Sequence, residues 1–328
     1  MWRALFDNVY VEKGTAEDPG TKRILERIGC DAPQLIGHYK DVFDARSGKS
    51  PAGRNLILAR NPGKHLYEGA PVCQSFGNEH FYYSPGVMNC IYDCEYCFLK
   101  GMYPGSDICI FTDIEETFSE IDALVKEHPV YVCASYNTDL TALESITGYV
   151  RRWCEKAAGV RNLSVEIRSK CGRTDIYGEL PVSGRAIFAF TLSPDEIRDR
   201  FEKGTPSLDA RIAALNAAMN AGFPVRICFD PMIYVRNWRE IYSAMVSKVA
   251  SSVDLSKVKD ISIGTFRISD QYLKNMRRKF TESPIAQYPY INEDGYYQYP
   301  DEVRTAMEDH IKGALAEACP DVRVFDWK

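Results

Sequence analysis

The apolar residues of this chain fall into short continuous runs, separated by segments in which they recur every three or four positions. Runs such as VYVCAS (130–135) and LSVEIRS (163–169) are typical of buried strands. Strands are predicted at about 82–88 and at 130–135, 163–169, 185–192, 224–230 and 261–266. Helices are predicted from Thr112, at 143–157, from Ser193, at 208–222, at 238–249 and at about 271–280. The two kinds of segment therefore alternate.

Local signals indicate where several of these helices begin and end. Thr112 and Glu115 have the spacing of a capping box. Ser193 and Pro194 have the residue types that open a helix as N-cap and first helical residue. Gly159 is expected to end the helix that precedes it, since glycine is the usual residue just past a helix. These signals support the alternation of strands and helices.

Strands joined by crossover helices form a parallel sheet. Six such units are two short of a closed eight-fold barrel, so an α/β fold is predicted, with an incomplete (β/α)6 barrel at residues 81–280. The active site of such a barrel lies at the carboxyl ends of its strands. Residues 1–80, rich in Gly and Pro, are expected to be an N-terminal extension packed on the barrel. Residues 281–328 are expected to form a Tyr-rich hairpin, with its turn at 292–295, and a helix.

Composition narrows the class of protein. The chain has 328 residues, 45% of them hydrophobic and 26% charged, which is typical of a globular protein. No run approaches 18 apolar residues, so no membrane span is expected, and the N-terminus lacks the apolar run of a secretory signal. A cytoplasmic protein is therefore expected. The net charge of −5 gives no sign of nucleic-acid binding by the chain as a whole, but it does not exclude a local basic cleft.

The chain contains eleven cysteines, and in a reducing compartment such a number favours metal or redox chemistry over disulfides. Cys90, Cys94 and Cys97 form a C-x3-C-x2-C motif, which we call the three-cysteine loop (residues 90–97). Three thiolates at this spacing can hold a [4Fe–4S] cluster and leave one iron open to a substrate or cofactor. A zinc site, which usually needs a second nearby pair of Cys or His, and three buried thiols are the alternatives.

This motif resembles the signature of the radical S-adenosylmethionine superfamily, whose usual fold is also a partial barrel. A closer resemblance is to the spore photoproduct lyase family. It is carried by CIYDCEYCFL (90–99), ASYNTDLTALESIT (134–147) and SLDARIAALNAAMNAGFPVRICFDPMIYVRNW (207–238), and by the Tyr-rich tail. The resemblance covers most of residues 82–280.

The resemblance implies a DNA repair lyase that uses a [4Fe–4S] cluster and S-adenosylmethionine. In the family, a 5′-deoxyadenosyl radical removes the C6 hydrogen of spore photoproduct, a methylene-bridged thymine dimer, and a protein group then gives hydrogen to the thymine allyl radical. The implied partners are UV-damaged DNA and a reductase such as flavodoxin or ferredoxin, with no membrane. Two other functions stay open: a radical enzyme acting on another nucleic-acid lesion or a small molecule, and a non-enzymatic iron–sulfur or zinc protein.

The resemblance also implies contacts to the cofactor. Tyr96 matches a loop tyrosine suited to hydrogen transfer, and Thr138 and Asp139 match a Ser-Asp pair that touches the cofactor. Lys170 matches a lysine suited to the methionine carboxylate, and Thr191 matches a serine. Ordinary structural roles stay open for three of them: Asp139 as a helix cap, Lys170 as a solvated cation and Thr191 as a strand residue.

The chain departs from the family at the expected hydrogen donor. Many members have a cysteine three residues before the aspartate, where this chain has Tyr136, and Phe98 replaces a frequent tyrosine. This chain therefore cannot transfer hydrogen through the same residues as those members of the family. Cys73, in a polar and aromatic segment before the first barrel strand, is the predicted replacement donor, and Cys133 is the second candidate. The hypothesis that neither cysteine donates also stays open, with Tyr136 as the third candidate.

Contacts to DNA are predicted in two places. Arg277, Arg278 and Lys279 are consecutive cations able to meet phosphates. Three tyrosines of the expected hairpin are predicted to stack against bases or wedge between them. These are Tyr296, Tyr297 and Tyr299. Packing within the protein is the alternative for both groups.

Overall fold

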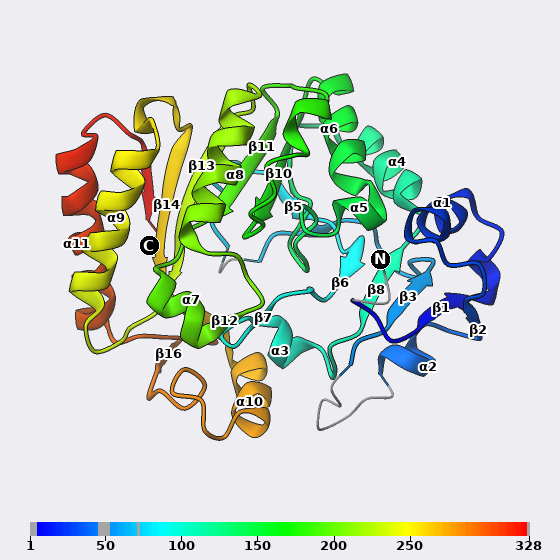
Figure 1. The fold of residues 1–328 in the computed structure, drawn as a ribbon, viewed down its shortest axis with the longest axis horizontal. Coiled ribbons are helices and arrows are strands. Elements are labelled where there is room, and N and C mark those ends of the chain that lie inside the picture. Colours follow the sequence, from blue (N-terminus) through cyan, green and yellow to red (C-terminus); the bar gives the residue numbers. More distant parts are fainter. Residues whose placement is uncertain (1–4, 45–52, 71–72, 327–328) are drawn as a thin grey trace.

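A curved sheet of eight strands dominates the computed structural model, which describes residues 5–44, 53–70 and 73–326 (Figure 1). In spatial order its strands are β18 (Val324–Asp326), β14 (Asp260–Thr265), β13 (Val225–Met232), β11 (Ala186–Thr191), β10 (Leu163–Ser169), β9 (Val130–Cys133), β5 (Phe81–Tyr83) and β4 (Tyr67–Glu68). Neighbours from β18 to β5 pair in parallel, and β4 is antiparallel at the edge. The predicted incomplete barrel is confirmed.

Each of the six predicted strands has a counterpart in this sheet. The run expected at 82–88 is the least accurate, because it is divided between two sheets. Its first part is β5, and its second part is β6 (Val87–Met88), with Pro85 and Gly86 between them. Strand β18 adds a seventh parallel strand that was not predicted, since three residues are too few to give a pattern.

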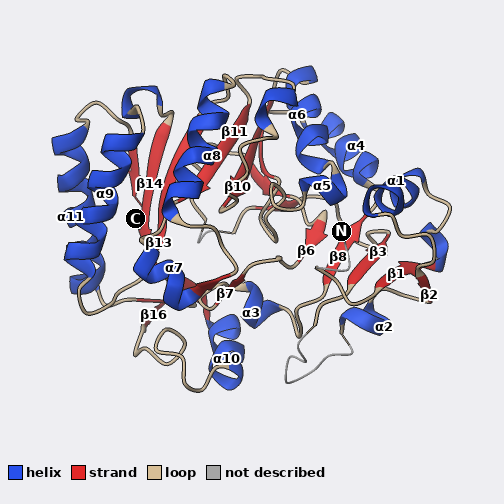
Figure 2. Ribbon diagram, viewed as in Figure 1, coloured by secondary structure: helices blue, strands red, loops and turns tan. Residues whose placement is uncertain are grey.

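Helices cover the outer face of the curved sheet (Figure 2). They are α4 (Ile114–Leu124), α5 (Glu144–Thr147), α6 (Tyr149–Gly159), α7 (Asp195–Phe201), α8 (Leu208–Asn220), α9 (Trp238–Ser252) and α11 (Asp301–Ala318). Helix α10 (Asp270–Lys279) lies apart from this layer, near the segment that follows the three-cysteine loop (Figure 1). The single helix expected at 143–157 is two, because Gly148 adopts a φ of +66° and ends α5. The expected capping box is wrong: the Thr112 hydroxyl instead contacts the Thr21 hydroxyl and the Ala59 carbonyl.

A second sheet lies beside the barrel and was not predicted. It contains β2 (Gln34–Ile36), β1 (Val9–Glu12), β3 (Leu56–Ala59), β8 (Ile108–Phe111) and β6, in that order. Two short helices, α1 (Pro19–Ile28) and α2 (Lys40–Phe43), accompany its first strands. Because β6 and β8 flank the three-cysteine loop in sequence, this sheet holds both ends of the segment that carries the loop.

The segment after the barrel forms the expected hairpin. Strands β16 (Ile291–Glu293) and β17 (Tyr296–Gln298) pair antiparallel, and β15 (Arg267–Ser269) pairs with the other edge of β17. Asp294 and Gly295 both have positive φ, at 49° and 86°, as the two central residues of a type I′ turn require. Among the described residues, no helix combines the length and apolar character needed to cross a bilayer.

Candidate active site

A cavity of about 490 Å³ opens at the carboxyl ends of the barrel strands, and the three-cysteine loop forms part of its wall. Successive side chains of a strand point to opposite faces of the sheet, so every second residue can reach the cavity. In β10 and the residue after it, Glu166, Arg168 and Lys170 line the cavity, whereas Val165 and Ile167 belong to the apolar core. The cavity is of the size that small-molecule sites usually have.

Short local elements hold the three-cysteine loop. Cys94 lies in β7 (Asp93–Cys94), which pairs with β12 (Glu202–Lys203), and Cys97 precedes α3 (Leu99–Met102). The three cysteines are free and line the same cavity. Burial raises the pKa of all three thiols, that of Cys90 to about 12. Binding of a cation would reverse this effect, because thiolates are the form that ligates metal.

The three cysteines do not form a compact ligand set as they stand. Within the described part of the chain, one group of three His, Cys, Asp or Glu has ligand atoms all within 4.8 Å of one another, and it contains no cysteine.

Two of the predicted cofactor contacts present unpaired polar groups to the cavity. The Thr138 hydroxyl is buried without a hydrogen-bond partner, as is the amide oxygen of its neighbour Asn137. The Lys170 ammonium has no hydrogen bond or ion pair among the described residues and lies 5.7 Å from the centre of the Tyr96 ring. Burial lowers the pKa of Lys170, but Cys94 and Glu202 outweigh this effect and raise it. The site thus offers a cation and a hydroxyl to a polar ligand.

Asp139 and Thr191 also line the cavity, but Asp139 is hydrogen-bonded within the protein and Thr191 is almost fully buried. The Asp139 carboxylate accepts hydrogen bonds from the backbone N–H groups of Ala142 and Lys170, at 3.0 and 2.7 Å, and from the Ser169 hydroxyl. Thr191 is 2% exposed at the end of β11. Asp139 therefore joins the turn before α5 to the strand end that carries Lys170. It is not the cap of that helix, whose N-cap residue is Leu143.

A buried network behind Tyr96 was not predicted. The Tyr96 hydroxyl donates to the Glu202 carboxylate, which also accepts from the Ser193 hydroxyl at 2.6 Å and pairs with the Arg211 guanidinium. Burial raises the pKa of Glu202, but Arg211 and Lys170 outweigh it and lower the pKa to about 2. Ser193 and Arg211 each lie nine residues from Glu202 but on neighbouring elements, and Tyr96 is 106 residues away, so no local pattern marks the network.

Replacing Glu202 by glutamine is expected to lower the free energy of unfolding by about 3 kcal/mol, because it leaves the Arg211 charge buried and unpaired. Urea unfolding at pH 7 measures this. Since the pKa of Glu202 is depressed in the folded state, its contribution is complete above the ordinary value of 4.5 and is lost as the pH falls toward 2. The difference in unfolding free energy between the unmodified protein and Glu202→Gln should therefore shrink as the pH falls from 4.5 toward 2. Glu115→Gln, at an exposed ion pair, should change stability little; equal losses in the two variants would contradict the prediction.

Both candidate hydrogen donors line the cavity. The Cys73 Sγ lies 3.3 Å from the Tyr136 hydroxyl, so these two residues are in direct contact. Cys133 is 6% exposed within β9, and its Sγ is 4.0 Å from a Glu166 carboxylate oxygen. Phe98 packs against the Tyr136 ring and has no hydroxyl to contribute.

The residues predicted to meet DNA differ in their exposure. Arg278 is exposed on α10, and Tyr296 lines the cavity. Arg277 instead donates to the backbone carbonyls of Ala286 and Tyr288 and lies over the Tyr297 ring.

Two further residues predicted to meet DNA, Tyr299 and Lys279, form hydrogen bonds to other parts of the protein. Tyr299 is 1% exposed, and its hydroxyl accepts from the Tyr234 N–H, so it has no surface for a base and is instead a core residue. The Lys279 ammonium donates to the carbonyls of Lys100 and Tyr103 and so anchors α10 to the segment around α3.

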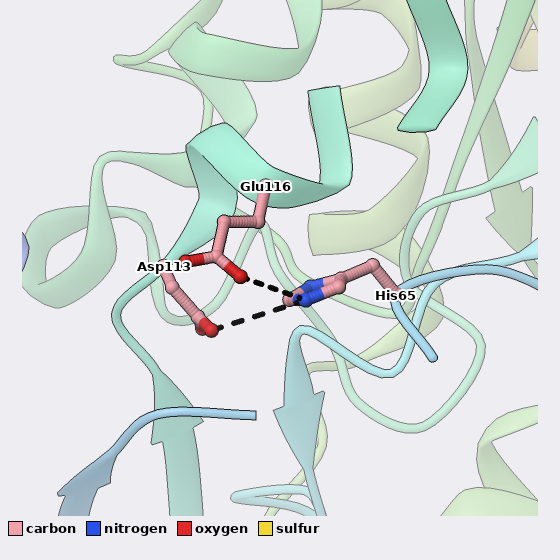
Figure 3. Close-up of side chains that lie close together, drawn as sticks. All are labelled: His65, Asp113 and Glu116. Carbon is pink, nitrogen blue, oxygen red and sulfur yellow. Dashed lines mark ion pairs between the residues drawn. The ribbon is translucent and has the colours of Figure 1, made fainter. Parts of the chain in front are cut away.

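A separate polar cluster lies where β3 and β8 end (Figure 3). The His65 Nε2 is 3.3 Å from a Glu116 carboxylate oxygen and 4.0 Å from one of Asp113, and its Nδ1 is 3.3 Å from the Thr117 hydroxyl. Burial raises the pKa of Asp113. None of these residues lines the central cavity. The cluster joins the loop after β3 to the start of α4.

A half-barrel whose mouth carries a three-cysteine loop and a polar cavity defines a radical S-adenosylmethionine enzyme. Residues 79–324 match the family model described as "Spore photoproduct lyase". The chain therefore belongs to the spore photoproduct lyase family.

Individual relatives agree with this assignment. The chain is 24% identical to the spore photoproduct lyase of Bacillus subtilis (strain 168) over 264 residues, which are 77% of this chain and 75% of the relative. It is 19% identical to that of Geobacillus sp. (strain Y412MC61) over 296 residues, 84% of this chain and 85% of the relative.

Solved structures show the same fold. A spore photoproduct lyase variant with bound AdoMet and dinucleoside spore photoproduct superposes with a TM-score of 0.83 at 18% identity, over 97% of this chain and 98% of that one. A spore photoproduct lyase complexed with the dinucleoside alone gives a TM-score of 0.83 at 17% identity, over 98% and 99%.

Proposed function

We propose that this protein repairs DNA by converting spore photoproduct to two thymines, with a [4Fe–4S] cluster and S-adenosylmethionine. The observation that carries the proposal is the single cavity that the three-cysteine loop shares with the polar strand ends of the half-barrel. Family membership supports it, because solved relatives bind AdoMet and the dinucleoside lesion. When bound, the cluster and S-adenosylmethionine supply the radical that attacks the lesion.

In this proposal the chain's own residues hold the two cofactors. Cys90, Cys94 and Cys97 would hold the cluster by their thiolates, and three ligands would leave one iron free to bind S-adenosylmethionine. The unpaired Lys170 ammonium binds the carboxylate of the methionine group, a charge-assisted contact. The orphaned Thr138 hydroxyl supplies a hydrogen bond. The remaining candidates, Tyr96, Asp139 and Thr191, shape the same wall, with Asp139 acting through the strand end that it fixes.

We infer that Cys73 gives its hydrogen to the thymine allyl radical. Its side chain faces the cavity and is less enclosed than that of Cys133, which lies within a strand. Burial raises the pKa of the Cys73 thiol, so the hydrogen stays on sulfur near neutral pH. A hydrogen-atom donor needs this protonated form.

Replacing Cys73 by alanine is expected to leave cleavage of the lesion intact but to divert the allyl radical to by-products. Chromatography of the products after anaerobic turnover measures this, with the fraction of clean thymine product falling by more than about tenfold. Cys133→Ala is the matched control and should keep the normal product. Clean repair by Cys73→Ala, or by-products from Cys133→Ala alone, would overturn the assignment.

The lesion must leave the base stack to enter a cavity of this size, as other enzymes that modify bases require. Tyr296 lines the cavity, and the exposed Arg278 and the hairpin residue Tyr297 belong to the same two elements, α10 and β17, that contribute to its wall. They are proposed to meet the phosphates and bases of UV-damaged DNA. A flavodoxin or ferredoxin is the proposed source of electrons.

The experiment is anaerobic incubation of the reduced, iron-loaded protein with S-adenosylmethionine and dinucleoside spore photoproduct, followed by chromatography. Conversion of the lesion to its repaired dinucleoside is expected, and a cyclobutane thymine dimer should stay unchanged. Formation of 5′-deoxyadenosine without repair would favour the alternative of a radical enzyme with another substrate. The absence of both products would favour a non-enzymatic metal protein.

A further inference from the structure

Tyr136 lies between the candidate hydrogen donor and a row of aromatic rings that leads to the surface. Its hydroxyl is 3.3 Å from the Cys73 Sγ. Its ring stacks on Tyr83, with centres 4.3 Å apart and planes 27° from parallel. Tyr83 in turn stacks on Tyr67, at 5.5 Å and 18°. Tyr67 is on the edge strand β4 and is 38% exposed, so the row ends at solvent.

A sulfur radical would remain on Cys73 after each repair, and the thiol must be restored before the next. Within the described residues, the Tyr136 phenol is the one hydrogen-bond partner found for the Cys73 sulfur. A thiol S–H and a phenol O–H have similar bond strengths, so hydrogen can pass between them in either direction. Burial raises the pKa of Tyr136, so its phenol keeps its hydrogen. Phe98, the other ring in contact with Tyr136, cannot take part because it has no hydroxyl.

Resting on the proposed function, we propose that Tyr136 restores Cys73 and that the resulting radical leaves the site through Tyr83 and Tyr67. In the first step the phenol O–H bond breaks and the thiol S–H bond forms, giving the Cys73 thiol and a Tyr136 phenoxyl radical. In the second, one electron and one proton reduce the phenoxyl radical to phenol. The electron comes from a low-potential one-electron carrier, of the class that also reduces the cluster, through the stacked rings. The proton comes from water.

This route has a consequence for stoichiometry. Hydrogen that reaches Cys73 from Tyr136 is not taken back from 5′-deoxyadenosine, so the cofactor is not regenerated along this path. One 5′-deoxyadenosine is therefore expected for each lesion repaired. A ratio far below one in the unmodified protein would overturn the proposal, since it would show that hydrogen returns to the cofactor.

Tyr136→Phe tests the relay, because it keeps the ring and removes the hydroxyl. The first turnover should stay within about twofold of that of the unmodified protein, and later turnovers should slow by more than about tenfold. Tyr234→Phe, at an exposed tyrosine outside the cavity, is the matched control. It should keep the normal rate in the first turnover and in later ones. Continued turnover of Tyr136→Phe at the normal rate would contradict the relay.

A spectroscopic readout separates the relay from a packing role. With Tyr83→Phe the outlet is blocked but the stack remains, so a tyrosyl radical should accumulate on Tyr136 during turnover. Electron paramagnetic resonance of freeze-quenched samples should show a signal that narrows with ring-deuterated tyrosine and disappears in the Tyr83→Phe/Tyr136→Phe double variant. The same signal in the double variant would overturn the proposal. Failure of the unmodified protein to repair any lesion would instead refute the proposed function.

Discussion

Replacing Cys94 by alanine is expected to abolish iron binding at the three-cysteine loop and, with it, cleavage of S-adenosylmethionine. Cys94 is the most enclosed of the three ligands, and β7 and β12 hold it against the buried Glu202. Two remaining thiolates leave two irons of a [4Fe–4S] cluster without protein ligands. Since altering a residue that merely supports a ligand typically costs 10- to 100-fold, loss of the ligand itself should lower cofactor cleavage by more than about 100-fold.

Iron and sulfide analysis of the reconstituted protein, together with chromatography of 5′-deoxyadenosine, measures this effect. Cys319→Ala is the matched control, because Cys319 lies at the end of α11 and does not line the cavity. It should retain both the iron and the reaction. One zinc ion per chain in place of iron would contradict the cluster assignment, as would cofactor cleavage by Cys94→Ala within about tenfold of normal.

Replacing Arg226 by methionine is expected to cause the largest loss of stability. Its guanidinium is 1% exposed and donates to the carboxylates of Glu166 and Asp260 and, at 2.7 Å, to the Tyr131 hydroxyl. It also lies 3.1 Å from the centre of the Phe76 ring. Methionine fills a similar volume but leaves the buried Asp260 carboxylate without the cation that pairs with it, while Glu166 keeps only Arg168. Breaking a buried pair in this way costs about 3–5 kcal/mol. Whole domains have about 5–15 kcal/mol of stability.

Urea unfolding followed by circular dichroism measures this loss. Arg239→Met, at an exposed arginine stacked on Trp238, is the matched control and should change stability little. Neutralising the stranded carboxylate in the Arg226→Met background, by Asp260→Asn, should recover part of the loss because that buried group then carries no charge. Equal stability of Arg226→Met and Arg239→Met would contradict this account of the barrel interior.

The barrel could be predicted because its strands are buried on both faces and short crossover helices separate them. VYVCAS and LSVEIRS are apolar enough to stand out, and the turn at 292–295 contains an Asp-Gly pair that suits a hairpin. The second sheet could not be predicted in the same way. Its strands β1, β3 and β8 are four residues each and lie about fifty residues apart, so their pairing depends on contacts that no local pattern records.

The site was predictable where a motif or a resemblance named the residues, and much less so elsewhere. The three-cysteine loop and Lys170 do reach one cavity. Glu202 was missed because its partners lie far from it in the sequence or on another element. Tyr299 shows the opposite error: a Tyr-rich hairpin looks like a binding surface, yet this ring is buried against the core.

The central claim is that this chain's radical chemistry acts on the lesion itself. The most direct test uses dinucleoside spore photoproduct that carries deuterium at C6, incubated anaerobically with the reduced, iron-loaded protein and S-adenosylmethionine. Mass spectrometry should find deuterium in 5′-deoxyadenosine, in step with the appearance of repaired dinucleoside. Unlabelled 5′-deoxyadenosine beside an unchanged lesion would contradict the account, because it would show that the radical forms but takes its hydrogen elsewhere.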